Sequence, residues 1–595
     1  MTRFLIPLFT LWCSLSFAQQ QLDINFNNTV ARISSNGLLF NDAANNHPGL
    51  EVPASSGKHT IFASQLWVAG VDDADVLHLA GGTYNATGHD YFSGPLTADG
   101  TAITTPEIMS AYDHIWSVLA IDVQQHIAYF QAIEDGTVGT LFPLGYEVPN
   151  SFITWPAHGN TTMDQAFYLA PFYDYNGNFV YDPENGDYPV ICGDQAAYFI
   201  INDKGLLHTE TGGEAIGIEV HVMVYQVSTS NNLNNTVFVQ YRVINRSSTT
   251  LHNAYLGIWS DLDIGNSADD FFGCDVERSA YYGYNGDDFD EDVTGVTDGY
   301  GSNTPRQVVQ ILAGPYMDAD GLDNEMPDEL SAYDTYGPYS YGFGDGVADN
   351  ERLGMTSFMK YVSATDALFG TMTEPEHYYQ YLQNHWQDGT PISYGGTGFL
   401  GAGVVDTPAS YILPGSSDPA HIGTAGIVEA PWTNEALPQP PTDQRGVAGI
   451  GPFTFEPGES IMTEVAYIFA NEMSSGISEE EFAQNAMDEV REYFETYLIN
   501  CGDNAYMTVD QKELPAVEKM RLYPNPASTT FNLVFPGNYD QKSMAITNAL
   551  GQIVYTANFN TSNFSLPVEH FSDGLYEVVV LYGNNAVHQS LIVRK

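Results

Sequence analysis

The sequence predicts a mostly β protein: several antiparallel β-sandwich domains, one amphipathic helix and a small C-terminal β-sandwich. Short runs of β-branched and aromatic residues recur along the chain, each bounded by Gly, Asn, Asp or Pro. A clear helical period appears only after Ser478. With 43% hydrophobic and 13% aromatic residues, the chain has enough apolar side chains for real cores, so its acidity does not predict disorder.

Residues 1–18 are predicted to be a signal peptide. Arg3 supplies the positive start, residues 4–15 are mostly apolar, and Ser16 and Ala18 are small residues at a cleavage site. This apolar run is too short to span a bilayer, and no later run is long enough. We expect a soluble mature chain that begins after Ala18.

Charge and cysteine content narrow the classes of partner. The 18 basic and 74 acidic residues give a net charge of −56, which repels nucleic acid and anionic lipid and suits a secreted protein that meets divalent cations. Cys13 leaves with the signal, so Cys192, Cys274 and Cys501 allow at most one internal disulfide, with its pairing open. Their spacing fits no zinc motif.

The 595 residues have room for about three to four domains. We expect a β-rich N-terminal region at 19–149 and a β-rich central region at 150–503. Three strands of the central region are read from their alternation, at residues 218–225, 236–244 and 254–263. In the last of them Ala254, Leu256 and Ile258 form the core face, and Tyr255, Trp259, Asp261 and Asp263 lie on the opposite face.

A helix is predicted to begin at Ser478, because Ser478 and Glu481 form a capping box. Its core-facing residues at helical spacing are Phe482, Ala486, Met487, Val490, Phe494 and Tyr497. Residues 504–518 are then a polar linker and a cleavage region ahead of the last domain.

The last domain, residues 519–595, contains short apolar runs at 530–535, 545–547, 553–557, 575–581 and 586–593. Pro524 and Pro526 hold the entry segment extended. Regular short strands of this kind favour a small sandwich. An ordinary terminal β-domain that binds a ligand remains an alternative.

The YPNP entry, the two Gly-centred turns and the basic end resemble the C-terminal sorting domain of cargo of the type IX secretion system. That system exports proteins across the outer membrane of some Gram-negative bacteria. The resemblance implies that the secretion machinery is a partner, that the protein is secreted or held at the outer cell surface, and that the tail is removed after export. It rests on Pro524, Asn525, Pro526, Gly551, Gly574, Tyr576 and Lys595.

Upstream phrases such as FITWPAHGN, YQYLQNHWQDGTPISYGG and GPFTFEPGESI resemble a group of large secreted proteins with the same tail. No activity is assigned to that group, so this resemblance implies no mechanism.

The segment DYNGNFVYDPENGD predicts a structural calcium loop, because alternating Asp and Asn side chains in a tight turn present several oxygens together. The candidate ligands are Asp174, Asn176, Asn178, the carbonyl of Val180, Asp182 and Asp187. The loop departs from an EF-hand, with Phe179 at the Gly position and Asn185 at the Glu position. A solvated Asx-rich turn is the alternative.

Three more acidic clusters are candidate calcium sites. Asp261 and Asp263 lie about 7 Å apart on one strand face, with Asp269 and Asp270 in the loop that follows. The other two clusters are Asp318, Asp320 and Asp323, and Asp345, Asp349 and Glu351. Each alone is more often a solvated loop, but together they favour bound cations that relieve carboxylate crowding.

No complete catalytic motif is present: the sequence lacks HExxH, GxSxG, a P-loop and a Rossmann fingerprint. His208 and His221 lie near Glu214 and Glu219, which we interpret as polar positions on an exposed sheet face. Trp259, with Asp261 and Asp263, is a candidate sugar-binding surface, and a Trp packed at an interface is the alternative.

The sequence therefore predicts a secreted, calcium-stabilised cargo that acts in binding, adhesion or structure, with a glycan or a cell-surface polymer as a possible ligand. An extracellular hydrolase acting on polysaccharide is the alternative, because paired carboxylates leave no trace in sequence.

Overall fold

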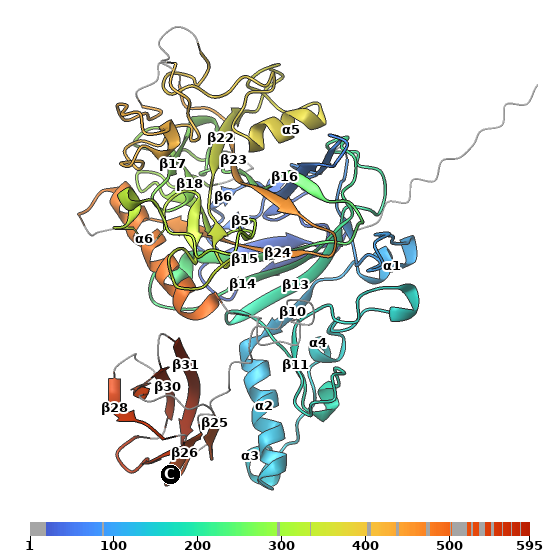
Figure 1. Cartoon of the computed structure of the whole chain (residues 1–595), viewed down its shortest axis with the longest axis vertical. Coiled ribbons are helices and arrows are strands. Elements are labelled where there is room, and N and C mark those ends of the chain that lie inside the picture. The colour runs from blue at the N-terminus through green and yellow to red at the C-terminus, as the bar shows by residue number, and fades with distance from the viewer. Residues whose placement is uncertain are drawn as a thin grey trace, which may run out of the picture. The chain divides into compact units, whose positions relative to one another are not determined.

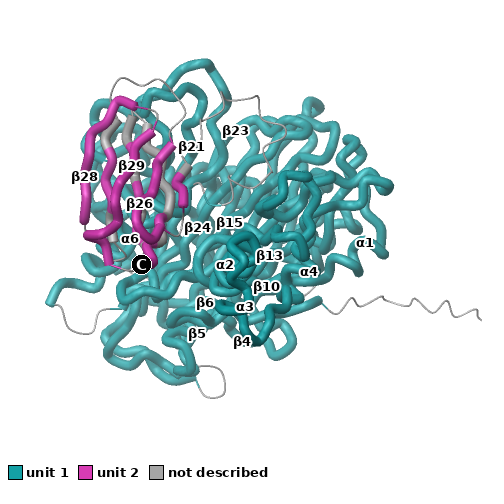
Figure 2. Tube along the Cα trace, turned by 90° about the horizontal axis from the view of Figure 1, so that it is seen from below, with its two compact units in different colours: residues 1–507 teal, residues 508–595 magenta. Residues whose placement is uncertain are grey.

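A computed structural model describes residues 19–85, 88–293, 298–333, 335–400, 406–435, 440–471, 476–499, 501, 521–524, 527–534, 542–548, 553–561, 563–572, 574–582 and 585–595 (Figure 1). The chain forms two compact units, residues 1–507 and 508–595 (Figure 2). The regions expected at 19–149 and 150–503 both belong to the first unit. The predicted signal peptide, the whole predicted linker, and Asn525, Pro526 and Gly551 lie outside the described residues.

The first unit is built on a nine-stranded antiparallel sheet in the order β10-β13-β14-β15-β24-β19-β18-β17, with β9 paired to β13 (Figure 1). Its strands are β9 (Phe92–Ser93), β10 (Trp116–Leu119), β13 (Gln195–Asn202), β14 (Ile218–Gln226), β15 (Thr236–Asn245), β17 (Asp270–Asp275), β18 (Ala280–Asn285), β19 (Arg306–Ala313) and β24 (Ser460–Ala470).

A five-stranded sheet in the order β22-β23-β16-β7-β8 shares a core with it. These strands are β7 (Ala63–Val71), β8 (Leu77–Ala80), β16 (Leu251–Asp261), β22 (Ser357–Val362) and β23 (Gln444–Phe455). A four-stranded sheet contains β1 (Gln21–Ile24), β2 (Val30–Ser34), β5 (Leu50–Glu51) and β6 (His59–Ile61). The remaining pairs are β3 (Asn41–Asp42) with β4 (His47–Pro48), β11 (Phe172–Tyr173) with β12 (Tyr188–Pro189), and β20 (Tyr339–Tyr341) with β21 (Arg352–Leu353).

The period-2 alternation of β14 explains how the nine-stranded sheet is covered on both faces. Val220 and Val222 join the core shared with the five-stranded sheet, whereas Met223 and Tyr225 join a second core. Helix α6 (Glu479–Tyr493) packs on that second core through Ala486 and its neighbours. The predicted antiparallel sandwich is confirmed, and the three predicted strands correspond to β14, β15 and β16. Strand β16 ends at Asp261, two residues before its predicted end.

Helix α6 begins as predicted, with the Ser478 hydroxyl oxygen accepting from the backbone N–H of Glu481 (3.1 Å). Its predicted core face is confirmed at Ala486, Met487, Val490 and Phe494 but is wrong at Tyr497, which is 66% exposed. A π-helical turn, η7 (Phe494–Leu498), follows α6 directly. The extra residue in that turn shifts the register and rotates Tyr497 out of the core.

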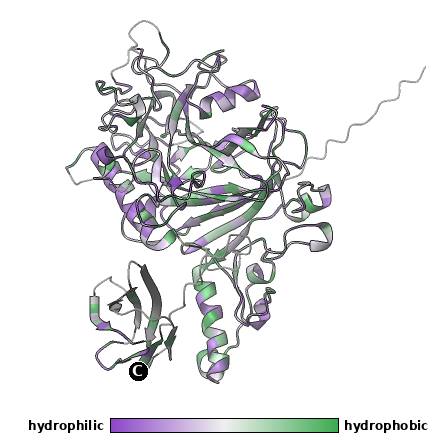
Figure 3. Cartoon of the chain, viewed as in Figure 1, coloured by the Kyte–Doolittle hydropathy of each residue, from purple (hydrophilic) through white to green (hydrophobic). Residues whose placement is uncertain are grey.

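The N-terminal region is less purely β than predicted, because α2 (Ala120–Glu134) is a 15-residue helix. The apolar residues of α2 are spread around its axis, so its sequence has no amphipathic stripe. Figure 3 shows hydrophobic and hydrophilic residues mixed along the visible side of this helix. The other helices are α1 (Pro106–Ala111), α3 (Val138–Leu141), α4 (Asn150–Ile153) and α5 (Pro375–Leu382), with short helical turns η1 (Thr161–Met163), η2 (Pro183–Asn185), η3 (Asn232–Asn235), η4 (Ser267–Asp269), η5 (Asp328–Leu330) and η6 (Ile422–Thr424). Among the described residues, none of the helices is long and apolar enough to cross a membrane.

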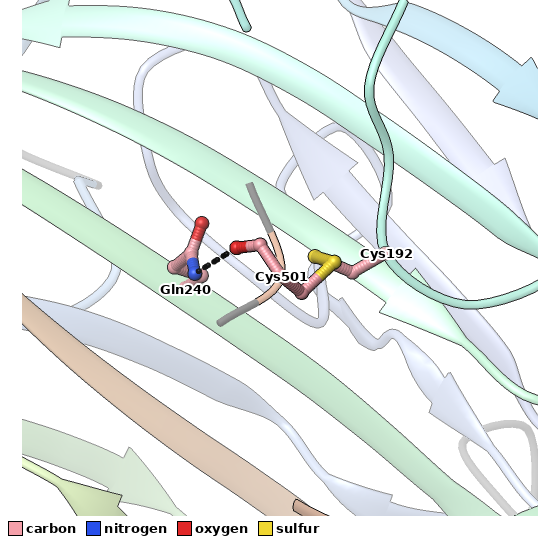
Figure 4. The surroundings of a disulfide bond; sticks show 3 residues. All are labelled: Cys192, Gln240 and Cys501. Carbon is pink, nitrogen blue, oxygen red and sulfur yellow. Dashed lines mark hydrogen bonds between the residues drawn. A yellow bond between two sulfur atoms is a disulfide. The ribbon is translucent and has the colours of Figure 1, made fainter. Parts of the chain in front are cut away.

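A disulfide joins Cys192 to Cys501 (Figure 4). Cys192 precedes β13, and Cys501 follows η7, so the bond attaches the C-terminal end of the first unit to the nine-stranded sheet. Gln240 on β15 donates from Nε2 to the carbonyl oxygen of Cys501 (3.4 Å). Cys274 remains a buried thiol.

The second unit is a small sandwich of two antiparallel sheets, β25-β26-β29 and β28-β27-β30-β31, around its own core. Its strands are β25 (Arg521–Tyr523), β26 (Thr530–Val534), β27 (Lys542–Asn548), β28 (Ile553–Phe559), β29 (Asn563–Pro567), β30 (Gly574–Tyr582) and β31 (Asn585–Val593). The five predicted strands of the tail are confirmed, and β25 and β29 are additions. Phe531 and Leu533 on one sheet meet Ile546, Val578 and Val580 on the other.

Candidate metal centre

Three carboxylates converge where β16 ends and β23 begins. In the register between these strands, Trp259 pairs with Val447 and Ser260 with Gly446. Continuing that register places Asp261 opposite Arg445 and Asp263 opposite Asp443. Each of the three aspartates offers an oxygen, and these oxygens lie within 4.8 Å of one another.

Arg445 lies in the middle of this group. Its Nη2 donates to Asp261 Oδ2 (2.9 Å), and its Nη1 donates to Asp443 Oδ1. Its Nε donates to the hydroxyl oxygen of Tyr84 (2.6 Å), and that hydroxyl in turn donates to Asp261 Oδ2 (2.6 Å). Side-chain exposure is 9% for Arg445 and 1% for Asp261, against 39% for Asp443. The centre is therefore closed on the Asp261 side and open on the Asp443 side.

Two buried oxygens of the centre are not matched by donors. Asp261 Oδ1 and Asp263 Oδ1 are buried and accept no hydrogen bond. Burial raises the pKa of Asp261 to about 6 although Arg445 opposes the shift. Two causes raise the pKa of Asp263 well above its usual range: burial is the larger, and the negative charge of Asp261 is the second. Arg445 and Tyr84 therefore pair with Asp261 through Oδ2 alone, and the two Oδ1 atoms carry the cost of burial.

The acidic region continues into the loop after β16. Asp270 is fully buried, and its Oδ2 accepts from the backbone N–H of Ile264 (2.9 Å) while its Oδ1 has no donor. Burial raises the pKa of Asp270 well above its usual range, and burial with the nearby Asp290 raises that of Asp269 to about 7. The structure thus brings the predicted Asp261, Asp263, Asp269 and Asp270 into one continuous acidic region.

The predicted calcium loop at 174–187 is closed by its own hydrogen bonds. Asp174 Oδ1 accepts from the backbone N–H of Gly177 (2.7 Å), and Asp174 Oδ2 accepts from that of Phe179 (2.6 Å). Phe179 has a positive φ of 66°, so this residue takes the left-handed conformation at the position that an EF-hand gives to Gly. Asp187, which is fully buried, accepts from the backbone N–H of Tyr175 and of Asp182 (both 2.8 Å).

The remaining polar side chains of that loop surround Asp182. Its carboxylate accepts from the side-chain amides of Asn176 (3.0 Å), Asn178 (3.2 Å) and Asn185 (3.0 Å). Val180 is exposed. The candidate side-chain ligands are therefore close together, with the amides of Asn176 and Asn178 directed at the carboxylate of Asp182.

Two acidic loops that are separate in sequence meet in the structure. Asp349 Oδ1 accepts from the backbone N–H of Asp320 (2.8 Å), and Asp323 accepts from the backbone N–H of Gly344 (3.0 Å) and Gly346 (2.8 Å). Asp318 instead accepts from the backbone N–H (2.7 Å) and the hydroxyl (2.8 Å) of Thr454 on β23. The structure joins Asp320 and Asp323 to the 345–351 loop and separates Asp318 from them.

Trp259 is not a surface residue, which corrects the sugar-binding prediction. Its side chain is completely buried, its Nε1 donates to the hydroxyl of Tyr361 (2.8 Å), and its ring stacks on Trp67 with centroids 6.5 Å apart. Helix α5 covers this face of β16, so that a Cβ at Gly257 would meet Leu382. A buried indole offers no ring face to a sugar.

The two histidines predicted to lie on an exposed sheet face are also buried. His221 Nε2 bonds Glu219 Oε1 (2.8 Å), which also accepts from Arg246 Nη2 (2.8 Å), and Tyr198 bonds His221 Nδ1 (2.7 Å). His208 lies within 2.7 Å of two backbone carbonyl oxygens, one on each ring nitrogen. The prediction failed because the second core covers the face of β14 that carries Glu219 and His221.

A small pocket of about 170 Å³ lies elsewhere in the first unit, with Asp418 and Glu429 in its lining. Asp418 accepts from the Tyr336 hydroxyl (2.7 Å) and from the backbone N–H groups of Ile422 (3.0 Å) and Gly423 (2.8 Å). Its carboxylate is therefore engaged in holding the backbone around the pocket.

In the second unit, the described residues of the predicted sorting signal are Pro524, Gly574, Tyr576 and Lys595. Tyr576 on β30 is buried, and its hydroxyl donates to the carbonyl oxygen of Ser572 (2.9 Å). Lys595 Nζ donates to the carbonyl oxygen of Glu569 (2.7 Å). These two contacts attach the start of β30 and the residue after the end of β31 to the loop that precedes β30.

Sequence reasoning found Asp261 and Asp263 but missed Tyr84, Asp443 and Arg445. The one available signal is the Asp-x-Arg pattern at 443–445, directly before an apolar strand. This pattern indicates a site only once the register between β16 and β23 is known, because that register brings together residues about 180 positions apart in the sequence.

Residues 521–594 match the family described as a secretion system C-terminal sorting domain. No curated protein sequence matches the chain. Among solved structures, a polysaccharide lyase aligns with 63% of this chain and 34% of its own, at 7% identity and a TM-score of 0.17. The chain thus spans about a third of that lyase, and a likeness this slight supports no functional argument.

Proposed function

We propose that this protein is a cargo of the type IX secretion system and that residues 521–594 direct its export. The observation that carries the proposal is the family match over a segment that folds as a separate sandwich. The secretion machinery would then be the partner of this unit, and the first unit would be the exported body, secreted or held at the cell surface.

We infer further that the body is a non-catalytic binding, adhesion or structural protein stabilised by calcium. Carboxylates of its acidic loops, such as Asp174, Asp187 and Asp323, accept hydrogen bonds from the backbone. Glu219 and His221 bond each other and Arg246 inside the protein, away from any substrate. The disulfide from Cys192 to Cys501 is consistent with an oxidising compartment outside the cytoplasm.

A polysaccharide hydrolase is the less supported alternative. It would need two close, accessible carboxylates in a cleft with aromatic side chains. Among the described residues, the pocket lined by Asp418 and Glu429 holds about 170 Å³, and Asp418 is occupied by three donors. Trp259, the aromatic residue predicted to stack a sugar, is buried.

Deleting residues 521–595 tests the export proposal. The truncated protein should accumulate in the periplasm, with the Cys192–Cys501 disulfide formed, while the full chain reaches the medium or the cell surface. A control chain in which an unrelated β-sandwich replaces the tail should also stay in the periplasm. Normal amounts of the truncated protein outside the cell would refute the assignment.

A further inference from the structure

The centre formed by Asp261, Asp263 and Asp443 has buried acceptors that the protein leaves without donors. Asp261 is 1% exposed in its side chain, and its Oδ1 has no hydrogen-bond partner although its Oδ2 has two. Asp263 Oδ1 is also buried and has no hydrogen-bond partner. An unpaired buried carboxylate oxygen carries the full cost of its lost hydration, so an additional positive ligand would stabilise both oxygens.

The charges point to the kind of ligand. Three carboxylates carry three negative charges, and Arg445 is the cation that bonds two of them. The two remaining negative charges match one divalent cation. All the offered ligand atoms are carboxylate oxygens, which hard cations such as calcium and magnesium prefer and soft metals do not.

We propose that a hard divalent cation of the calcium or magnesium class binds between Asp261, Asp263 and Asp443, beside Arg445. Arg445 holds one oxygen of Asp261 and one of Asp443, so it orients both carboxylates and leaves Asp261 Oδ1 for the metal. Tyr84 supports this arrangement by donating to Asp261 while it accepts from Arg445.

The position of the centre gives the cation a structural role. Asp261 closes β16, the middle strand of the five-stranded sheet, and Asp443 immediately precedes β23, its neighbour. A cation there joins the ends of strands that come from distant parts of the chain. The half-exposed Asp443 gives the cation a route from solvent. The proposal is independent of export, because it concerns the first unit alone.

A proton shared between Asp261 and Asp263 is the competing explanation. A shared proton would relieve the repulsion between these two carboxylates and would leave Asp443 bonded to Arg445. The two explanations differ in one measurable quantity, which is the number of metal ions that the folded protein binds.

The experiment counts the ions bound to the purified full-length protein by equilibrium dialysis and elemental analysis, in calcium chloride and separately in magnesium chloride. Asp263→Asn keeps the shape of the side chain and removes its charge, and it should bind one ion fewer per chain than the natural protein in at least one of the two salts. The salt that shows the loss identifies the cation. The exposed Asp73→Asn is the matched control and should bind the natural number.

Asp443→Asn is the second variant, because Asp443 lies at the open side of the centre and its replacement should leave the fold intact even if Asp263→Asn does not fold. It should also lose one ion, and the calcium- or magnesium-induced rise in melting temperature should be smaller than in the control. Natural ion counts in both salts for Asp443→Asn, or for a folded Asp263→Asn, would overturn the proposal in favour of the shared proton.

Discussion

Cys192 and Cys501 are 309 residues apart in sequence and are joined by a disulfide that fastens the end of the first unit to its central sheet. The covalent link restricts the unfolded chain over a very long loop, so its removal should destabilise the protein by about 2–5 kcal/mol. We therefore expect Cys501→Ser to lower the midpoint of guanidinium unfolding of the first unit.

Cys274→Ala provides the comparison, because Cys274 is a buried free thiol whose loss leaves the disulfide in place. Thiol titration of the unfolded mature protein should find one free thiol before reduction and three after it. Three thiols before reduction would show that the bond does not form.

Glu219 and Arg246 form a buried ion pair, and we expect the protein to lose stability in acid when Glu219 becomes protonated. Burial raises the pKa of Glu219, but Arg246 and His221 outweigh burial and lower it to about 2. A carboxylate with a lowered pKa contributes stability above its unfolded pKa of about 4.5, and this contribution disappears as the pH falls towards 2. Glu219→Gln should cost about 3–5 kcal/mol at pH 7, because it leaves Arg246 without its charge partner.

Urea unfolding at several pH values measures this effect. The difference in unfolding free energy between the natural protein and Glu219→Gln should be largest near neutral pH and should shrink between pH 4.5 and pH 2. Asp73→Asn, an exposed acidic control, should show no such difference. A constant difference across this range would mean that the loss comes from packing and not from charge.

Trp259 should be a stability residue, since it lies between Trp67, Tyr84 and Tyr361. Trp259→Ala removes a fully buried side chain and a hydrogen bond to Tyr361, and should cost about 3–5 kcal/mol. Leu144→Ala is the matched control, because Leu144 is fully exposed and its loss should change stability by less than about 0.5 kcal/mol. Chemical denaturation of the two variants compares them directly, and an unchanged midpoint for Trp259→Ala would contradict its burial.

The sequence predicts the strands of this protein better than the surfaces that they form. The alternation of Val220 and Val222 with Met223 and Tyr225 is visible in the sequence and places β14 correctly. Sequence does not show what covers each face, and for that reason it leaves Trp259 open between a sugar-binding surface and a packed position and predicts an exposed face for His221. Helix α2 was missed for a related reason, because its apolar residues follow no stripe that marks one buried side.

The candidate sites show the same limit. A local loop such as 174–187 can be recognised from the spacing of its Asp and Asn residues. The centre at Asp261 combines residues from three distant segments, represented by Tyr84, Asp261 and Asp443. The pairing of β16 with β23 brings Asp261 and Asp443 together, and Tyr84 follows β8 on the other side of β16. Side-chain chemistry in a β-sandwich depends on strand register, and register depends on contacts that local spacing does not record.

The loop at 174–187 provides the last prediction, which is that it binds calcium and that Asp182 is a ligand. The Asp182 carboxylate accepts from the amide groups of Asn176, Asn178 and Asn185. Calcium prefers oxygen ligands, so binding would turn the amide oxygens of Asn176 and Asn178 inward and replace those hydrogen bonds. Asp182→Asn should therefore remove calcium binding while it keeps most of the amide contacts.

The loop also contacts α2, because the hydroxyl of Tyr175 donates to Glu134 (2.6 Å). Calcium should therefore raise the melting temperature and slow hydrogen exchange in α2 of the natural protein. A ligand that binds only the folded state stabilises it by about 2.7 kcal/mol at a hundred times its dissociation constant, and extracellular sites often need millimolar calcium.

Asp182→Asn should lose the calcium-induced change in the hydrogen exchange of α2. Asp174→Ala should lose that change and should also lower stability without calcium, because Asp174 caps the backbone N–H groups of Gly177 and Phe179. Other acidic loops keep a residual response in the melting temperature, so the exchange rate of α2 is the decisive measurement. If calcium slows exchange in α2 equally in Asp182→Asn and in the natural protein, the loop is a solvated turn.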